Sequence, residues 1–206
     1  MKWPKTWHVP DSPGITRDDR VLENIDHLKN REIVITEKLD GETFSLYYNH
    51  LHARSQDYPH HESQNWLKAF HARFKYLIPA HWQIAGEYLY AQHTICYDEL
   101  TSYFYVFAII DNKLQMVFSL DETLLICQSL GLVYVPILYR GLLPDKFIMP
   151  KKSVFGQEIE GYVVRPTGEF PVSEIYKNMA KYVRADHVKT DKHWRTNWVP
   201  NKLKNI

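Results

Sequence analysis

Short apolar runs recur along the chain, separated by polar or turn-forming residues, which is the pattern expected of β-strands. Most of their residues are β-branched or aromatic, and this composition favours strands over helices. The pair of runs at 103–118 has Asp-Asn-Lys at its junction, which predicts a hairpin turn. The runs cover residues 32–37, 43–48, 82–90, 103–110, 113–118, 132–139, 159–165 and 179–184.

Two segments carry apolar residues at helical spacing instead and predict helices. The first follows Ser63, a predicted N-cap. The second begins with Ser119 and Glu122, a capping-box pattern, and ends at the predicted C-cap Gly131. Strands and helices together predict one α+β domain of mainly antiparallel strands with a few packed helices. The apolar positions of the first helix are Trp66, Leu67, Phe70, Phe74 and Leu77.

The remainder of the chain adds little regular structure. Residues 1–31 are rich in Pro, Asp and Arg with weak periodicity, and predict an irregular segment packed on the core. No apolar signal core or membrane-length apolar run is present, so we expect a soluble cytoplasmic protein without membrane contact. Cys96 and Cys127 provide no disulfide framework and predict two buried, reduced thiols.

Composition limits the classes of partner. Apolar residues make up 45% and charged residues 24% of the 206, as in ordinary globular proteins. The net charge is +1, which excludes a polycation, so any nucleic-acid surface must be local.

A lysine at a strand junction is the first candidate for chemistry. Lys38 lies between two apolar runs in T-E-K-L-D-G, where Gly41 allows a sharp turn and Asp40 could help to hold a cation. Lysine is a nucleophile only when uncharged, and partial desolvation or nearby cations would lower its pKa from about 10.4. Taken alone, the motif fits a solvent-exposed hairpin lysine better.

Further charged residues lie within or beside the other strand patterns. Such residues are costly there unless they face a shared polar cleft. Basic groups late in the chain suit phosphates, and the aromatic strand around Phe107 suits a base, so the residue types predict a nucleotide-phosphate site with a metal. The charged residues are Arg54, Glu87, Glu160, Lys181 and Arg184.

These motifs, in this order, resemble those of the covalent nucleotidyltransferases, the superfamily of polynucleotide ligases and mRNA capping enzymes. The motifs are K-L-D-G, Arg54, G-E-Y, F-Y-V-F-A-I, I-E-G-Y-V-V-R and A-K-Y-V-R, and they span nearly the whole chain. Within the superfamily the chain resembles most the ATP-dependent RNA ligases of the phage double-strand RNA ligase type. The resemblance implies an ATP-grasp-like ligase adenylation domain whose antiparallel sheets flank a nucleotide cleft.

The resemblance implies roles for the residues around the nucleotide. Lys38 would attack the α-phosphate of ATP and become lysyl-AMP. Glu37 would help to read adenine, and Glu87 would bind the ribose hydroxyls. Phe107 would stack on adenine, with Tyr105 as the alternative on the same strand face.

It also implies roles around the phosphates. Arg54 would contact the phosphate end, and Lys181 would bind the α-phosphate. Glu160 would support Mg²⁺ or Mn²⁺, mostly through water, beside the cation site expected at Asp40.

The last motif departs from the family pattern, in which two lysines often lie one residue apart. In a regular strand Lys181 and Arg184 would point to opposite faces. Three interpretations stay open: a bulge realigns Arg184, Lys181 acts alone, or Lys177 assists.

The function implied is joining of 5′-phosphate and 3′-hydroxyl RNA ends through lysyl-AMP and AMP-capped intermediates, in RNA repair of bacterial or phage origin. RNA ends or a nicked duplex would be the substrate, with an end-healing kinase or phosphatase as partner of a monomeric enzyme. The alternatives are a DNA ligase, a capping-type nucleotide transferase, or a degenerate module that binds RNA or nucleotide without chemistry.

The end of the chain is basic. Residues 181–206 hold seven Lys or Arg and two Asp, a balance of +5, interleaved with Trp194 and Trp198. This suits a surface that tracks a backbone and stacks bases, although the tryptophans could equally pack on the domain. We expect a single domain, 1–206, with a short basic tail at about 190–206 and no separate C-terminal domain.

Overall fold

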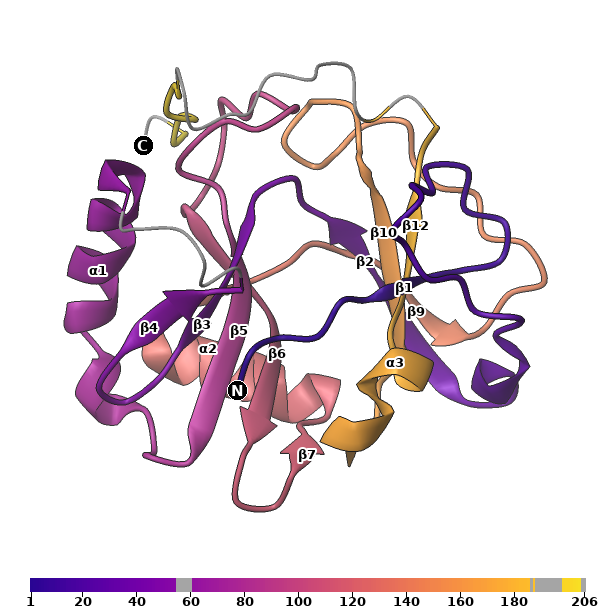
Figure 1. Cartoon of the computed structure of the whole chain (residues 1–206), viewed down its shortest axis with the longest axis horizontal. Helices are drawn as coiled ribbons and strands as arrows, with labels where there is room; N and C mark the ends of the chain where they lie inside the picture. The colour runs from indigo at the N-terminus through magenta and orange to yellow at the C-terminus, as the bar shows by residue number, and fades with distance from the viewer. Residues whose placement is uncertain (55–60, 186, 188–197, 205–206) are drawn as a thin grey trace.

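Two β-sheets lie side by side in the computed structural model, which describes residues 1–54, 61–185, 187 and 198–204 (Figure 1). Most strand pairs are antiparallel, and few helices are present among the described residues. The prediction of an α+β fold with mainly antiparallel strands is confirmed. No described helix has the length and apolarity needed to cross a membrane.

The first sheet has five strands within the described part, in the order β1-β12-β10-β2-β9. Within this sheet only β1 and β12 pair in parallel, so a strand near the N-terminus lies beside one that is more than 170 residues later, as Trp7 pairs with Ala180. The pairing of β2 with β10 sets Lys38 opposite Gly161. The strands are β1 (Trp7–His8), β2 (Glu32–Lys38), β9 (Ile137–Leu142), β10 (Gly161–Pro166) and β12 (Ala180–Val183).

The second sheet follows the order β11-β7-β6-β5-β3-β4 in the described residues, with β8 parallel to β6. A register shift between Ala85 and Gly86 places an extra residue of β6 at Phe107. The strands are β3 (Glu42–Leu46), β4 (Leu51–Ala53), β5 (Trp82–Tyr88), β6 (Phe104–Asp111), β7 (Met116–Val117), β8 (Val133–Tyr134) and β11 (Phe170–Pro171).

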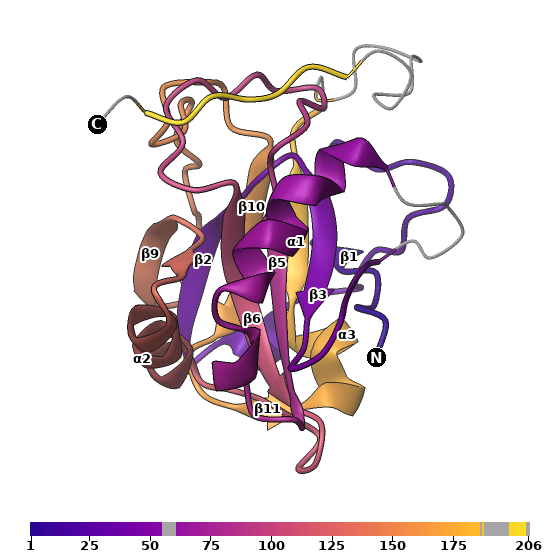
Figure 2. The ribbon, with the colours of Figure 1, turned by 90° about the vertical axis from the view of Figure 1, so that its left-hand side faces the viewer.

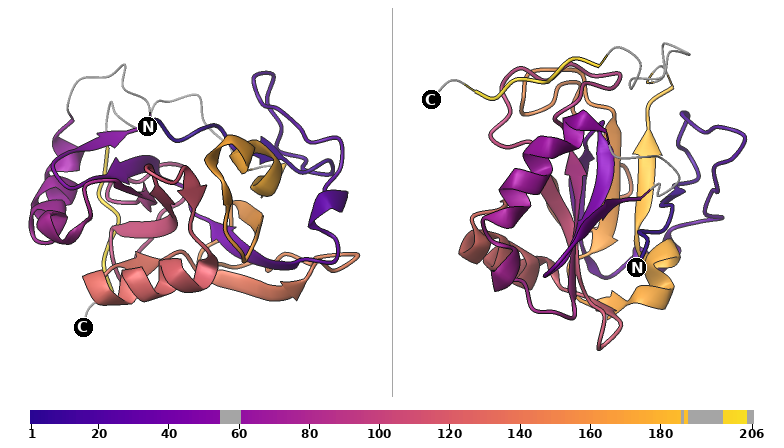
Figure 3. Two further views of the ribbon diagram at one scale, coloured as in Figure 1. Left: turned by 90° about the horizontal axis from the view of Figure 1, so that it is seen from below. Right: turned by 60° about the vertical axis from the view of Figure 1, so that its left-hand side comes forward.

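The two faces of the second sheet pack against different elements. Helices α1 and α2 cover one face (Figures 2 and 3). There, Leu67 of α1 and Cys127 of α2 belong to the same buried cluster as Ile84 and Ile109. On the other, Trp3 of the N-terminal segment and residues around α3 pack against the sheet. Val163 of β10 packs against the same cluster, so this second face is the one that meets the first sheet. The helices are α1 (Asn65–Ala72), α2 (Leu120–Leu130) and α3 (Ile175–Asn178), with 3₁₀ turns η1 (Asp26–Leu28), η2 (Glu62–Gln64), η3 (Lys75–Leu77) and η4 (Val172–Glu174).

The first predicted helix is only partly correct. Helix α1 ends at Ala72, and Leu77 lies in η3 with 66% of its surface exposed. Ser63 is not the N-cap: it lies within η2, whose N-cap is His61. Ser63 is buried, and its carbonyl accepts a hydrogen bond from the Tyr88 hydroxyl. Tertiary packing therefore decides its position.

The second predicted helix is confirmed at both ends. The Ser119 side chain accepts from the Glu122 amide, the Glu122 carboxylate accepts from the Ser119 amide, and Gly131 adopts φ 65°. The predicted hairpin is also confirmed, because β6 and β7 pair and the Asp111 carboxylate accepts two amides of the turn. Of the two cysteines, Cys127 is buried as expected, whereas Cys96 is exposed, contrary to expectation.

Replacing the capping serine should destabilise the fold. Ser119→Ala removes the acceptor for the Glu122 amide and should lower the free energy of unfolding by about 1 kcal/mol. Chemical denaturation followed by circular dichroism measures this difference. Ser129→Ala, in the same helix but at an exposed position, is the matched control and should change stability by less than half as much. Equal effects of the two changes would contradict the assignment.

Candidate active site

Lys38 occupies the end of β2, where the chain leaves the first sheet for the second. Gly161 pairs with Lys38, so Glu160, the residue before Gly161, is brought beside the lysine. The Lys38 Nζ lies 2.6 Å from Glu160 Oε1, and the Glu160 side chain is only 6% exposed. Two motifs that are more than a hundred residues apart thus form one ion pair.

The charged groups around Lys38 shift its pKa in the direction opposite to the one expected for a lysine nucleophile. Burial lowers the pKa of Lys38, but the Glu160, Glu87 and Asp40 carboxylates outweigh this, and the pKa lies above its ordinary value. The predicted lowering of the pKa is therefore wrong for the unliganded protein. Lys38 is an ammonium held between carboxylates.

A cavity of about 350 Å³ opens beside Lys38 between the two sheets. Both sheets contribute to its lining, the first through β2, β10 and β12 and the second through β3, β5 and β6. The structure thus brings six of the predicted residues to one space. They are Glu37, Lys38, Arg54, Glu87, Phe107 and Lys181.

Two of the carboxylates that line the cavity, Glu37 and Glu87, are partly or wholly removed from water. Burial raises the pKa of Glu87 to about 7, although Lys38 opposes the shift, and Glu87 Oε2 accepts from Thr43 Oγ1 at 3.1 Å. Glu37 is 2% exposed, and burial raises its pKa as well. Buried acceptors in the wall of a cavity are suited to hydroxyl or amino donors of a ligand.

Of the two aromatic candidates predicted from sequence, Phe107 is the one that lines the cavity, beside Trp3 and Tyr134. It is the extra residue of the bulge in β6, and its ring meets that of Trp3 edge to face with centroids 4.9 Å apart. Tyr105 is 1% exposed, and its hydroxyl accepts from the amides of Thr101 and Ser102, so it serves the core. The expectation that Tyr105 and Phe107 share a regular strand face did not foresee this bulge.

Lys181 is the one of the three basic candidates of the last motif that lines the cavity. Its Nζ donates to Asp19 Oδ1 at 3.1 Å, and burial lowers its pKa while Asp19 opposes the shift. Arg184 lies beyond the end of β12 and pairs with Glu158 at 3.0 Å. Lys177 is exposed in α3, over the ring of its neighbour Tyr176.

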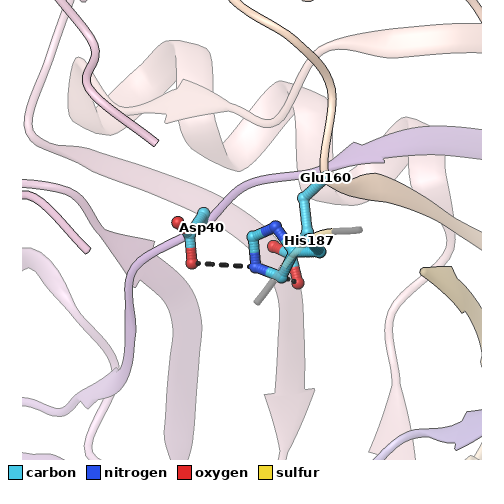
Figure 4. Close-up of side chains that lie close together, drawn as sticks. All are labelled: Asp40, Glu160 and His187. Atoms are coloured by element: carbon cyan, nitrogen blue, oxygen red, sulfur yellow. Dashed lines mark ion pairs between the residues drawn. The ribbon is translucent and has the colours of Figure 1, made fainter. Parts of the chain in front are cut away.

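A second cluster includes Glu160, the ion-pair partner of Lys38. One ligating atom each of Asp40, Glu160 and His187 lies within 4.8 Å of the others (Figure 4). His187 Nε2 is 3.4 Å from both Asp40 Oδ1 and Glu160 Oε1. Burial raises the pKa of Asp40, but hydrogen bonding to His187 and the Ile95 amide lowers it more. Glu160 Oε2 is buried without a hydrogen-bond partner, so the donor set fits a divalent cation.

Several residues of the site were not predicted from sequence. Arg165, on β10, lines the cavity at 2% exposure, and its Nε and Nη1 have no hydrogen-bond partner. It ends the I-E-G-Y-V-V-R motif, so its place in that motif was a usable signal. His187, Trp3 and Asp19 lie in segments without strand or helix periodicity, and no pattern singles them out.

The predicted basic tail is described only in part. Lys192, Trp194 and Arg195 lie outside the described residues. Trp198 packs on the domain: its Nε1 donates to Glu62 Oε1 at 2.9 Å and its ring lies 5.5 Å from that of Tyr90. Of the two alternatives for the tryptophans, Trp198 therefore agrees with packing on the domain.

Comparison with known proteins places these features in a family context. Residues 31–183 match the family model described as RNA ligase, well over half of the chain. No curated protein sequence matches.

Solved structures of the RNA ligase of Naegleria gruberi share the fold. The form with pyrophosphate has a TM-score of 0.59 at 18% identity, covering 88% of this chain and 57% of that one. A point mutant with ATP and Mn gives 0.58 at 16% identity with the same coverage. An apo mutant gives 0.57 at 15%, covering 90% and 57%. This chain thus spans a little over half the length of those structures, and at such identities the likeness concerns the fold.

The raised pKa of Glu87 has a consequence for stability. The folded state binds the Glu87 proton more tightly than the unfolded state, so this residue's contribution to stability is present at low pH and is lost as the pH rises towards about 7. Glu87→Gln should therefore raise the melting temperature at pH 8 relative to the parent protein, and the difference should shrink towards pH 5. The exposed Glu169→Gln is the control. A pH-independent difference for Glu87→Gln would contradict the shift.

Proposed function

The chain belongs to the RNA ligase family, and from this premise we propose that it is an ATP-dependent RNA ligase that works through a lysyl-AMP intermediate on Lys38. The observation that carries the proposal is the position of Lys38. Its ammonium is paired with Glu160 at 2.6 Å on the edge of a cavity that also presents Arg54, Lys181 and Phe107. This set offers a nucleophile, cations for phosphates and an aromatic ring for a base.

The first step transfers AMP to the protein. The Lys38 nitrogen, after losing a proton, forms a bond to the α-phosphorus of ATP, the bond to the bridging oxygen breaks, and pyrophosphate leaves with the electron pair. AMP then passes to a 5′-phosphate end, and a 3′-hydroxyl displaces it to join the strands. Because charge develops on phosphoryl oxygens, positioning and cationic side chains such as Lys181 should account for most of the acceleration.

The nucleoside would occupy the inner part of the cavity. We assign base stacking to Phe107, whose ring faces the space from the bulge, and the ribose hydroxyls to Glu87. Arg165 is a buried cation with two unpaired donor groups in the same wall, suited to acceptor atoms of the nucleotide. Glu37 supplies a buried carboxylate for an amino group.

Asp40, Glu160 and His187 would hold a divalent cation, Mg²⁺ or Mn²⁺. When bound, the cation would neutralise charge on the phosphates and on these carboxylates. An imidazole among the ligands favours Mn²⁺ over Mg²⁺, which prefers oxygen. The chain's own part is to fix the carboxylates: Asp40 Oδ2 accepts from the amides of Thr94 and Ile95, each at 2.8 Å.

We also propose a role in RNA repair. A ligase of the phage double-strand RNA type would seal RNA breaks in repair, and a kinase or phosphatase must first supply the 5′-phosphate and 3′-hydroxyl ends. Labelled ATP and GTP separate ligation from capping-type transfer. Nicked RNA, nicked DNA and single strands then separate the substrates.

Lys38 should carry the adenylate. After incubation with ATP and Mg²⁺, intact mass spectrometry should detect one added AMP on the parent protein and none on Lys38→Ala. Lys113→Ala, an exposed lysine in the β6–β7 turn, is the control and should be modified like the parent. An adduct that persists in Lys38→Ala would refute the assignment.

Among the late basic residues, Lys181 should be required for adenylylation. Lys181→Ala should slow the formation of lysyl-AMP about a hundredfold, since it removes an oriented charge from the cavity. Lys177→Ala makes the same change of charge at an exposed site on α3 and should leave the rate near that of the parent. The opposite ranking in a single-turnover assay would move the role to Lys177.

The metal cluster can be tested without turnover. His187→Ala should weaken Mn²⁺ binding, measured by electron paramagnetic resonance on the unliganded protein, by about tenfold or more. His52→Ala removes a histidine outside the cluster and should not alter the affinity. Unchanged Mn²⁺ affinity in His187→Ala would remove His187 from the ligand set.

A further inference from the structure

A second pocket adjoins the nucleotide cavity. It measures about 400 Å³ and is lined by the N-terminal segment and by Arg54. Trp3 and Arg54 line both spaces, so the two are neighbours that share a wall. Its lining residues are Lys2, Trp3, Pro4, Lys5 and Arg54, and we call it the N-terminal pocket.

The N-terminal segment that forms this pocket is anchored at several points. The Met1 carbonyl accepts from the Tyr47 hydroxyl at 2.9 Å and from Gln83 Nε2 at 3.0 Å. Trp3 is 4% exposed against Phe107, and β1 pairs with β12. The segment therefore crosses from the second sheet to the first, as Figure 1 shows. Lys2 and Lys5 flank the buried tryptophan but are themselves exposed.

Lys38 and Lys181 of the nucleotide cavity differ from the cations of the N-terminal pocket in their partners. Lys38 and Lys181 each pair with a carboxylate, Glu160 and Asp19 respectively. By contrast, no side chain in the described part of the protein forms an ion pair or hydrogen bond with the side chain of Lys2, Lys5 or Arg54. Three positive charges around one concave space, without a carboxylate partner among the described residues, suit an anion.

We propose that the N-terminal pocket binds phosphate groups that lie beyond the α-phosphate. The inference rests on the proposed function. With the α-phosphate at Lys38 and Lys181, Arg54 is the residue that leads from the cavity into the pocket. The pyrophosphoryl end of ATP would follow this route, and Lys2 and Lys5 would stabilise the negative charge of the departing pyrophosphate. The 5′-phosphate of an RNA end offers the same chemistry.

The first arm of the test uses inorganic pyrophosphate. Lys2→Gln combined with Lys5→Gln should weaken pyrophosphate binding to the unadenylylated protein about tenfold, measured by isothermal titration calorimetry. Lys113→Gln combined with Lys146→Gln removes the same charge at exposed positions outside the pocket and is the matched control.

The second arm uses RNA. Fluorescence anisotropy at constant salt compares a 5′-phosphorylated RNA with the same RNA ending in a 5′-hydroxyl. Loss of pyrophosphate affinity alone assigns the pocket to ATP, loss of the preference for a 5′-phosphate alone assigns it to RNA, and loss of both assigns it to both. If the pocket variant matches the control variant in both arms, the pocket binds no phosphate and the inference is overturned.

These outcomes are distinct from failure of the proposed function. A parent protein that forms no adduct on Lys38 would refute the ligase mechanism, whatever the pocket binds. A parent protein that adenylylates normally, with a pocket variant indistinguishable from its control, would refute only the pocket.

Discussion

The passage of the chain from one sheet to the other, directly after Lys38, is the constraint on which the site depends. A Cβ at Gly41 would lie 2.5 Å from the Tyr88 carbonyl oxygen, so only glycine permits the backbone to pass this close to β5. Leu39 is buried beside it, and the Asp40 amide donates to the Tyr97 hydroxyl. Because the chain crosses tightly at this point, Lys38 lies at the boundary between the two sheets, where residues of both sheets reach it.

The position of the site between the two sheets also explains why its charged side chains are paired. Charged groups buried between two sheets are costly unless they are paired, and removal of one partner leaves the other uncompensated. The unliganded protein meets this cost with internal pairs, Lys38 with Glu160 and Lys181 with Asp19. A nucleotide that enters the cavity competes with these carboxylates for the two cations. Its net affinity therefore includes the free energy of breaking protein ion pairs.

The sequence was informative where a local pattern determines structure. Most of the strands, the capping box at Ser119 and the position of Lys38 and Glu87 beside one cavity could be predicted because period, turn chemistry and motif agree there. The predicted run 132–139 is an exception, because it divides between β8 in one sheet and β9 in the other, and β1, β4 and β11 were not predicted. The sequence was uninformative where a residue distant along the chain determines the local conformation. Ser63 looks like an N-cap but is held by packing, and the bulge at Phe107 depends on the register with β5.

Three further residues of the site show the same limit. Asp19 and Trp3 meet the site only because the irregular N-terminal segment folds across it. His187 reaches Asp40 from a polar stretch that has no periodicity. No rule of spacing along the chain could place them.

The parallel pairing of β1 with β12 also bears on the order in which the protein is made. The second sheet is built largely from residues 42–117, which leave the ribosome early and pair with near neighbours in sequence. The first sheet needs Trp7 to meet Ala180 and Glu37 to meet Tyr162. Contacts of such long range form slowly. The boundary between the sheets therefore stays incomplete in a nascent chain until β12 emerges, and synthesis interrupted before β12 should yield a protein whose first sheet is incomplete.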